Sequence, residues 1–140
     1  MERPKIPIAQ IVFGDIVYWL CVLAAVICIV GPVISILSED NNVMNPHYVF
    51  SAIWEGKSAE VVWKEVGGGF PGGHFWLHNL TKGDGFTQFG LVIGCACALP
   101  ALLGAAIAYL SVKPRLYVWV ILSLWVAAII AVSAIGIIDA

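Results

Sequence analysis

The sequence predicts an all-α integral membrane protein in which three transmembrane helices accompany a long extracytoplasmic loop between the first and second. Its composition is 61% hydrophobic and 11% charged, whereas an ordinary soluble domain has about 45–50% apolar and 25% charged residues. A soluble globule of 140 residues could not cover its surface with so few charges. The composition therefore excludes a disordered tail, a nucleic-acid-binding protein and a secreted disulfide scaffold.

The positions of the charged residues define the spans. The intervals 16–37, 86–112 and 116–138 contain no Lys, Arg, Asp or Glu. A hydrocarbon core of about 30 Å needs roughly 20 helical residues, and helix satisfies every backbone polar group inside lipid. We therefore expect transmembrane helices at 16–37, 87–110 and 116–138.

The distribution of basic residues predicts the orientation. Basic side chains in short loops favour the cytoplasmic side, and here they gather in two short segments, at Arg3, Lys5, Lys113 and Arg115. The loop carries the other three, Lys57, Lys64 and Lys82, spread along its length. The prediction is a prokaryotic cytoplasmic membrane protein. Its segments 1–15 and 111–115 are cytoplasmic, and 38–86 and 139–140 are extracytoplasmic.

Small residues recur at helical spacing along the spans. They allow close backbone approach where lipid gives little hydrophobic drive for helix association. The predicted contact residues are Cys21, Cys28 and Gly31 on the first helix, and Gly90, Gly94, Cys97, Ala101 and Gly104 on the second. These stripes hold together the three helices of this chain or, alternatively, turn one face toward another subunit.

Two prolines lie inside predicted spans. Pro32 and Pro100 each remove a helical hydrogen bond and are expected to kink their helices. Pro100 lies near the bilayer middle, where a kink could expose carbonyls to an ion or substrate, although structural kinks are common. No histidine or charged residue lies in the span cores. This chain alone therefore cannot hold a haem between helix histidines or build a proton relay.

Capping signals predict short amphipathic helices in the loop and mark the ends of the spans. Asn45 before Pro46 begins one helix that stops at Gly56, and Ser58 begins another that stops at Gly67. We expect both on the outer membrane face or on a partner, with their aromatic residues turned inward, namely Phe50, Trp54 and Trp63. Asp15 is expected to cap the first span or to pair with Lys113 or Arg115, and Asp84 or Thr87 to cap the second.

His74 and His78 are the candidate ligand residues. If residues 74–80 are helical, the two imidazoles lie one turn apart on one face, with Trp76 between them in sequence. Such a pair is suited to contacting a metal or a quinone head group. Two ligands do not complete a metal site, so the alternative is a pair of interfacial histidines bonded to backbone or water.

These observations favour a non-enzymatic accessory subunit of a multi-subunit membrane complex, in the respiratory or electron-transfer class. The subunit would have no cofactor of its own and would contact a partner's haem or quinone with its outer loop. Its partners would be the bilayer and other membrane subunits, and no nucleic acid. The alternatives are a homo-oligomeric channel or small-solute transporter, moving at Pro100 and the glycine-rich stretch 67–73, and a membrane enzyme that uses the two histidines.

Overall fold

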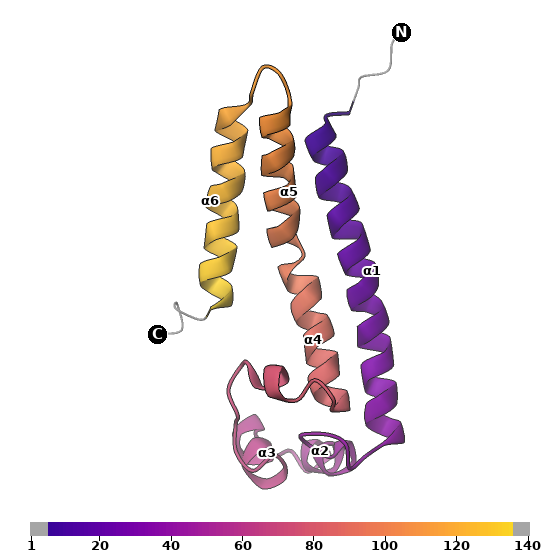
Figure 1. The fold of residues 1–140 in the computed structure, drawn as a ribbon. Coiled ribbons are helices and arrows are strands. Elements are labelled where there is room, and N and C mark those ends of the chain that lie inside the picture. Colours follow the sequence, from indigo (N-terminus) through magenta and orange to yellow (C-terminus); the bar gives the residue numbers. More distant parts are fainter. Residues whose placement is uncertain (1–5, 136–140) are drawn as a thin grey trace. The chain divides into compact units, whose positions relative to one another are not determined.

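The structure is a computed structural model that describes residues 6–135. Every regular element in that range is a helix (Figure 1). In chain order they are α1 (Ile8–Leu37), α2 (Pro46–Trp54), α3 (Ala59–Val66), the 3₁₀ helix η1 (Phe75–His78), α4 (Gly83–Ala96), α5 (Ala98–Ser111) and α6 (Tyr117–Ala134). The predicted fold class is confirmed, including the short helices between the first two long ones.

Three helical segments are long and apolar enough to cross a membrane, at Ile8–Leu37, Gly83–Ser111 and Tyr117–Ala134. Each segment is mostly exposed, because only 11–22% of its most apolar 18 residues is buried inside the protein. Exposed aliphatic side chains at this density need lipid rather than water around them. The protein therefore sits in a lipid bilayer with three membrane-spanning segments.

The helices that contain the first two spans begin before the predicted span starts at residues 16 and 87. α1 starts at Ile8, directly after Pro7, so Asp15 is an exposed residue inside the helix and not its cap. The second span starts at Gly83, which places Thr87 within α4, where its hydroxyl donates to the Gly83 carbonyl. A single interfacial charge does not stop a helix whose backbone bonds are already satisfied. Residues 1–5 of the predicted segment 1–15, residues 136–138 of the predicted span 116–138 and the predicted segment 139–140 lie outside the described residues.

The chain forms two compact units, residues 1–22 with 93–140 and residues 23–92. In the described part of the first unit, α5 buries four of its five alanines, and Ala9 of α1 joins Ala105 and Ala108 in one apolar cluster. Tyr109 of α5 stacks with Trp119 of α6, their ring centroids 6.4 Å apart. Small residues thus let α5 approach α1 while an aromatic pair joins it to α6.

In the second unit, α1 and α4 meet at two glycines. A Cβ on Gly31 would lie 2.9 Å from the Thr87 backbone nitrogen, and one on Gly90 would lie 2.8 Å from Cγ2 of Ile27. The contact at Gly31 is with the backbone of the facing helix and the contact at Gly90 is with side chains, and neither leaves space for an added Cβ. Three residues of the predicted stripes, Cys28, Gly31 and Gly90, take part in these contacts.

The second span is interrupted at Cys97, which separates α4 from α5 (Figure 1). Pro100 lies three residues further on and cannot donate a bond to the Ala96 carbonyl, against which its ring would also press. The interruption therefore falls one turn before the proline that causes it. α1, by contrast, continues as α-helix through Pro32.

The two loop helices begin where the sequence predicts, but their caps differ. Asn45 Oδ1 accepts a hydrogen bond from the His47 backbone N–H at 3.0 Å, whereas the Ser58 side chain makes no capping bond. Asn45→Ala is therefore expected to destabilise α2 by about 1 kcal/mol, and Ser58→Ala to have little effect. Hydrogen exchange of the α2 and α3 amides measures both, and equal protection losses would contradict the difference.

Candidate functional site

Two polar residues, buried Asn42 and half-buried Asp84, organise the loop in residues 23–92. Asn42 is 8% exposed. Its amide donates to the carbonyls of Ser35, Ser38 and Glu39 at 2.9–3.2 Å and accepts from the Ser35 hydroxyl at 2.6 Å. These bonds tie the residues directly after α1 to the last turn of that helix.

Asp84 fastens the same stretch to the start of α4. Its Oδ2 atom accepts from the backbone N–H groups of Val43 at 2.7 Å and Met44 at 3.1 Å. The Gly83 N–H adds a bond to the Asn41 carbonyl at 3.1 Å. Charged hydrogen bonds of this kind are stronger than neutral ones, so residues 41–44 form a fixed strap between the two spans.

A groove of about 400 Å³ lies beside this strap. Most of its wall is apolar or aromatic, formed by Pro32, Ile36, Met44, Phe50, Trp63 and Phe75. Its polar lining includes Asp84, Thr87 and Gln88 of α4. Three aromatic rings around a small polar group suit a flat, amphipathic, membrane-soluble molecule.

Gln88 is the polar residue of the groove that sequence reasoning missed. Its side chain is half-buried and makes no hydrogen bond to any other residue in 6–135, whereas Thr87 and Asp84 are already bonded. An amide inside a span is expensive unless it finds a partner. The sequence signal that could have identified Gln88 is its position, because it is a polar residue one turn into the second span.

The structure does not give His74 and His78 a shared face. Only Phe75–His78 is helical, and it is a 3₁₀ turn with His74 at its cap. At three residues per turn, positions four apart point about 120° away from each other, so the condition for a paired site fails. Among residues 6–135, no three His, Cys, Asp or Glu side chains are grouped to hold a metal ion.

Trp76, the third predicted contact residue, is directed at α4. It stacks with Phe89 at a centroid distance of 5.6 Å. The ring therefore anchors η1 to the second span, and neither it nor the two histidines is part of the groove wall.

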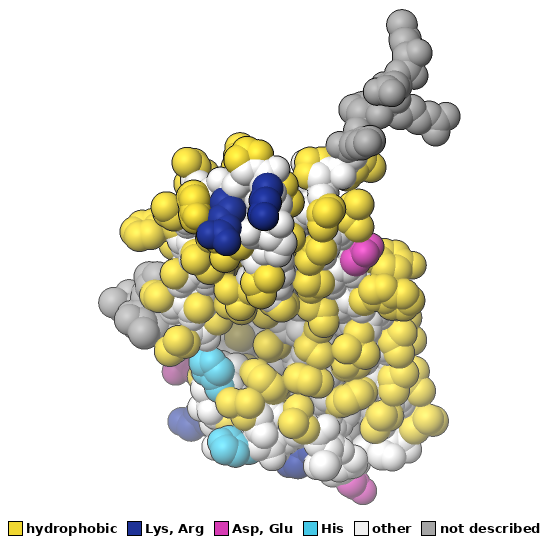
Figure 2. Space-filling model, turned by 45° about the horizontal axis from the view of Figure 1, so that its top comes forward, with side chains coloured by type: hydrophobic (Ala, Val, Ile, Leu, Met, Phe, Trp, Pro, Cys, Tyr) yellow, Lys and Arg dark blue, Asp and Glu magenta, His cyan; other side chains and the backbone are white. Residues whose placement is uncertain are grey.

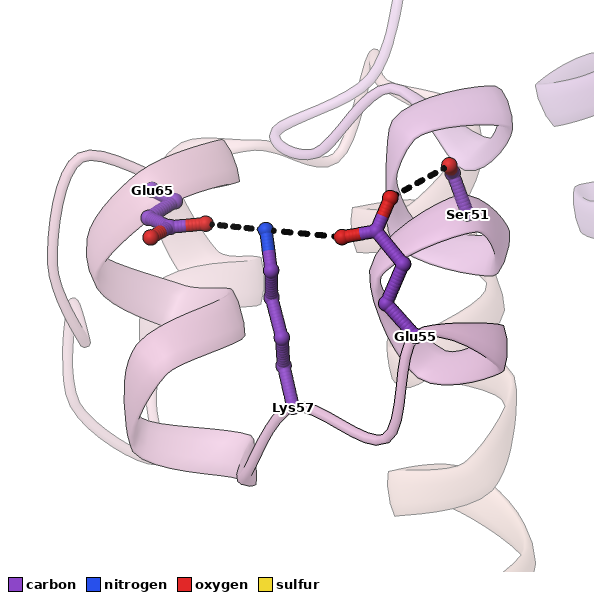
Figure 3. Close-up of polar contacts among 4 residues, drawn as sticks. All are labelled: Ser51, Glu55, Lys57 and Glu65. Carbon is purple, nitrogen blue, oxygen red and sulfur yellow. Dashed lines mark hydrogen bonds and ion pairs between the residues drawn. The ribbon is translucent and has the colours of Figure 1, made fainter.

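An ion-pair network joins α2 to α3. Figure 3 shows Lys57 reaching between two carboxylates, with Nζ 3.0 Å from Glu55 and 2.7 Å from Glu65. Hydrogen bonding and charge from Lys57 lower the pKa of Glu55, and its bonds to Glu65 and then Glu55 raise the pKa of Lys57. These side chains are solvent-exposed, so the network fixes geometry more than it stabilises the fold.

Lys57→Met is expected to return the pKa of Glu55 upward toward that of an ordinary glutamate. A depressed folded-state pKa stabilises the fold above the unfolded-state pKa, and this contribution is lost as pH falls through the folded-state value. Carboxyl NMR titration of Glu55 measures the change. The matched control is Lys64→Met, since Lys64 forms no ion pair within residues 6–135; an equal shift in that variant would contradict the assignment.

Hydrophobic side chains cover much of the face drawn in Figure 2, with few charged groups among them. In the first unit the exposed hydrophobic residues include Trp19 on α1 and Trp125 on α6.

Within residues 6–135, Asp15 forms no ion pair with Lys113 or Arg115. The pairing predicted for Asp15 is therefore wrong.

Together these features define a polytopic α-helical membrane protein with a folded loop between its first two spans. A protein-family model matches residues 9–137, and the chain belongs to that family. It is also similar to an uncharacterized protein of Archaeoglobus fulgidus, at 24% identity over 104 residues, covering 73% of this chain and 67% of that one. No solved structure matches the chain.

Proposed function

We propose that the protein is an accessory subunit of a multi-subunit membrane complex and that it contacts its partner through α2. The observation that supports this proposal most strongly is the exposed apolar face of α2. Phe50, Ile53 and Trp54 are 60%, 55% and 87% exposed, and their spacing of three and four residues places them together. The opposite side of α2 is anchored by buried Ala52.

A fixed aromatic face is more than a connector needs. The strap at residues 41–44 and the Lys57 network hold α2 in place. The three apolar side chains are therefore already ordered when they meet a partner. Pre-ordered aromatic residues are the usual anchors of protein interfaces, because little side-chain entropy is lost on binding. Trp54, with its large exposed area, is the expected centre of the contact.

The electron-transfer assignment is part of the same proposal. The groove supports it, because an aromatic wall with the Gln88 amide suits the ring of a lipid-soluble quinone belonging to the partner's site. The subunit would cover that site and supply no cofactor of its own.

Purification from native membranes in mild detergent tests the proposal. We expect the intact assembly to contain other chains and to absorb visible light through haem or flavin, and Trp54→Ser to lose those chains. The control is Trp125→Ser on α6, which is 68% exposed. A pure homo-oligomer without cofactor absorbance would overturn the subunit assignment.

A homo-oligomeric channel or transporter is the second candidate. The interruption at Cys97 favours it, because Pro100 leaves the Ala96 carbonyl without its helical donor, and a free carbonyl inside a span can bind an ion or solute. In that case the purified protein alone, reconstituted in vesicles, would pass small solutes. Pro100→Ala, which restores the helical bond, would change the flux.

We also propose that the loop faces outward and residues 111–115 face the cytoplasm. A cysteine at exposed position Ser58 is expected to react with a membrane-impermeant maleimide added to intact cells, and one at exposed Lys113 only after lysis. The unaltered protein measures the background from its own four cysteines. The reverse labelling pattern would show that the orientation is inverted.

A further inference from the structure

Two thiols from distant parts of the sequence meet inside the first unit. The Sγ atoms of Cys21 on α1 and Cys97 at the start of α5 lie 3.8 Å apart, although the residues are 76 positions apart. All four cysteines are free thiols. Cys28 is instead 4.0 Å from the Thr87 carbonyl, and Cys95 is exposed on α4. The pairing of Cys21 with Cys97 is therefore selective.

We propose that Cys21 and Cys97 form an oxidation site in the membrane, where a lipid-soluble quinone converts the dithiol to a disulfide that joins α1 to α5. The sulfur–sulfur bond forms as both S–H bonds break. The two electrons and two protons pass to the quinone, which leaves as hydroquinone. The quinone class follows from location, since both cysteines lie in charge-free spans that ionic, water-soluble oxidants do not enter.

The two sulfur atoms need only a short approach to form the bond. A disulfide needs the sulfurs at about 2.05 Å, so the two atoms must approach by roughly 1.7 Å from their separation of 3.8 Å. Cys97 lies at the interruption between α4 and α5, where Pro100 has removed a helical hydrogen bond. Cys21 is exposed to the surrounding lipid, which gives the oxidant access.

The experiment uses the whole protein, reduced and then placed in phosphatidylcholine nanodiscs. Incubation with decylubiquinone is expected to lower the intact mass by two hydrogen atoms, to produce hydroquinone absorbance, and to yield a linked peptide containing Cys21 and Cys97. The melting temperature should rise by about 10 °C, because the cross-link closes a long loop. The same treatment with diamide, a water-soluble oxidant that carries no charge, tests the oxidant class.

Matched variants locate the site. Cys21→Ser and Cys97→Ser should each abolish the cross-link, whereas Cys28→Ser and Cys95→Ser should leave it intact. Thiol counting on the unaltered protein needs no variant to fold, and the oxidised form should keep two of its four reactive thiols. Links through Cys28 or Cys95, links between chains, or four remaining thiols would overturn the site. A cross-link formed by diamide but not by the quinone would overturn the assigned oxidant.

Discussion

Gly31→Ala is expected to destabilise the protein by about 2–3 kcal/mol, because the added methyl has no space where α1 meets α4. Its Cβ would lie 2.9 Å from the backbone nitrogen and 3.0 Å from the Cα of Thr87. Backbone atoms cannot rotate aside as a flexible side chain can, so the two helices must separate. Thermal unfolding in a single detergent, followed by tryptophan fluorescence, measures the loss.

The same helix supplies a matched control. A methyl group added at Gly14 would have no atom within 4 Å, so Gly14→Ala should be neutral or stabilise by up to about 1 kcal/mol through helix propensity. Gly90→Ala should fall between the two, since its added methyl meets the side chains of Ile27 and Cys28. Equal melting temperatures for the Gly31 and Gly14 variants would contradict the close approach at Gly31.

Asp84→Ala is expected to release the strap and to cost about 1–3 kcal/mol, because it leaves the backbone N–H groups of Val43 and Met44 without their acceptor. Asp84→Asn should lose less, since one carbonyl oxygen remains to accept. Hydrogen exchange at Val43 and Met44 reports the release directly, and limited proteolysis of the loop should accelerate.

Asp40→Ala is the control for this second effect. Asp40 is exposed and makes no hydrogen bond or ion pair among the described residues. Its removal changes the loop's net charge by the same amount without touching the strap. If the Asp40 variant exchanged as fast as the Asp84 variant, loss of charge rather than loss of the two bonds would be the cause.

The elements that depend on local composition could be predicted from the sequence. Charge-free intervals identified the three spans, and Asn45 with Pro46 identified the start of α2, because lipid solvation and helix capping act on neighbouring residues. The exact start of α1 could not be found in this way. A charged residue such as Asp15 can lie within a helix where that helix passes out of the hydrocarbon.

The candidate site depends on contacts between residues far apart in sequence. Asp84 binds backbone groups some 40 residues away. Every residue except proline has a backbone N–H, so the residue types do not show which N–H groups a distant carboxylate will bind. The small-residue stripes predicted that helices approach closely, but not that Gly31 would face Thr87. The shared face of His74 and His78 was conditional on α-helix, and the chain forms a 3₁₀ turn there. Ligand binding by these histidines stays a prediction.

The length of α1 has a consequence for membrane thickness. Its 30 residues extend about 45 Å, whereas a hydrocarbon layer of about 30 Å holds roughly 20 of them. Counting back from Leu37, the layer would end near Tyr18 and Trp19, whose rings prefer that boundary. Thicker bilayers should therefore draw Trp19 deeper and shift its fluorescence to the blue, so that this helix adapts by sliding or tilting as lipid chain length changes.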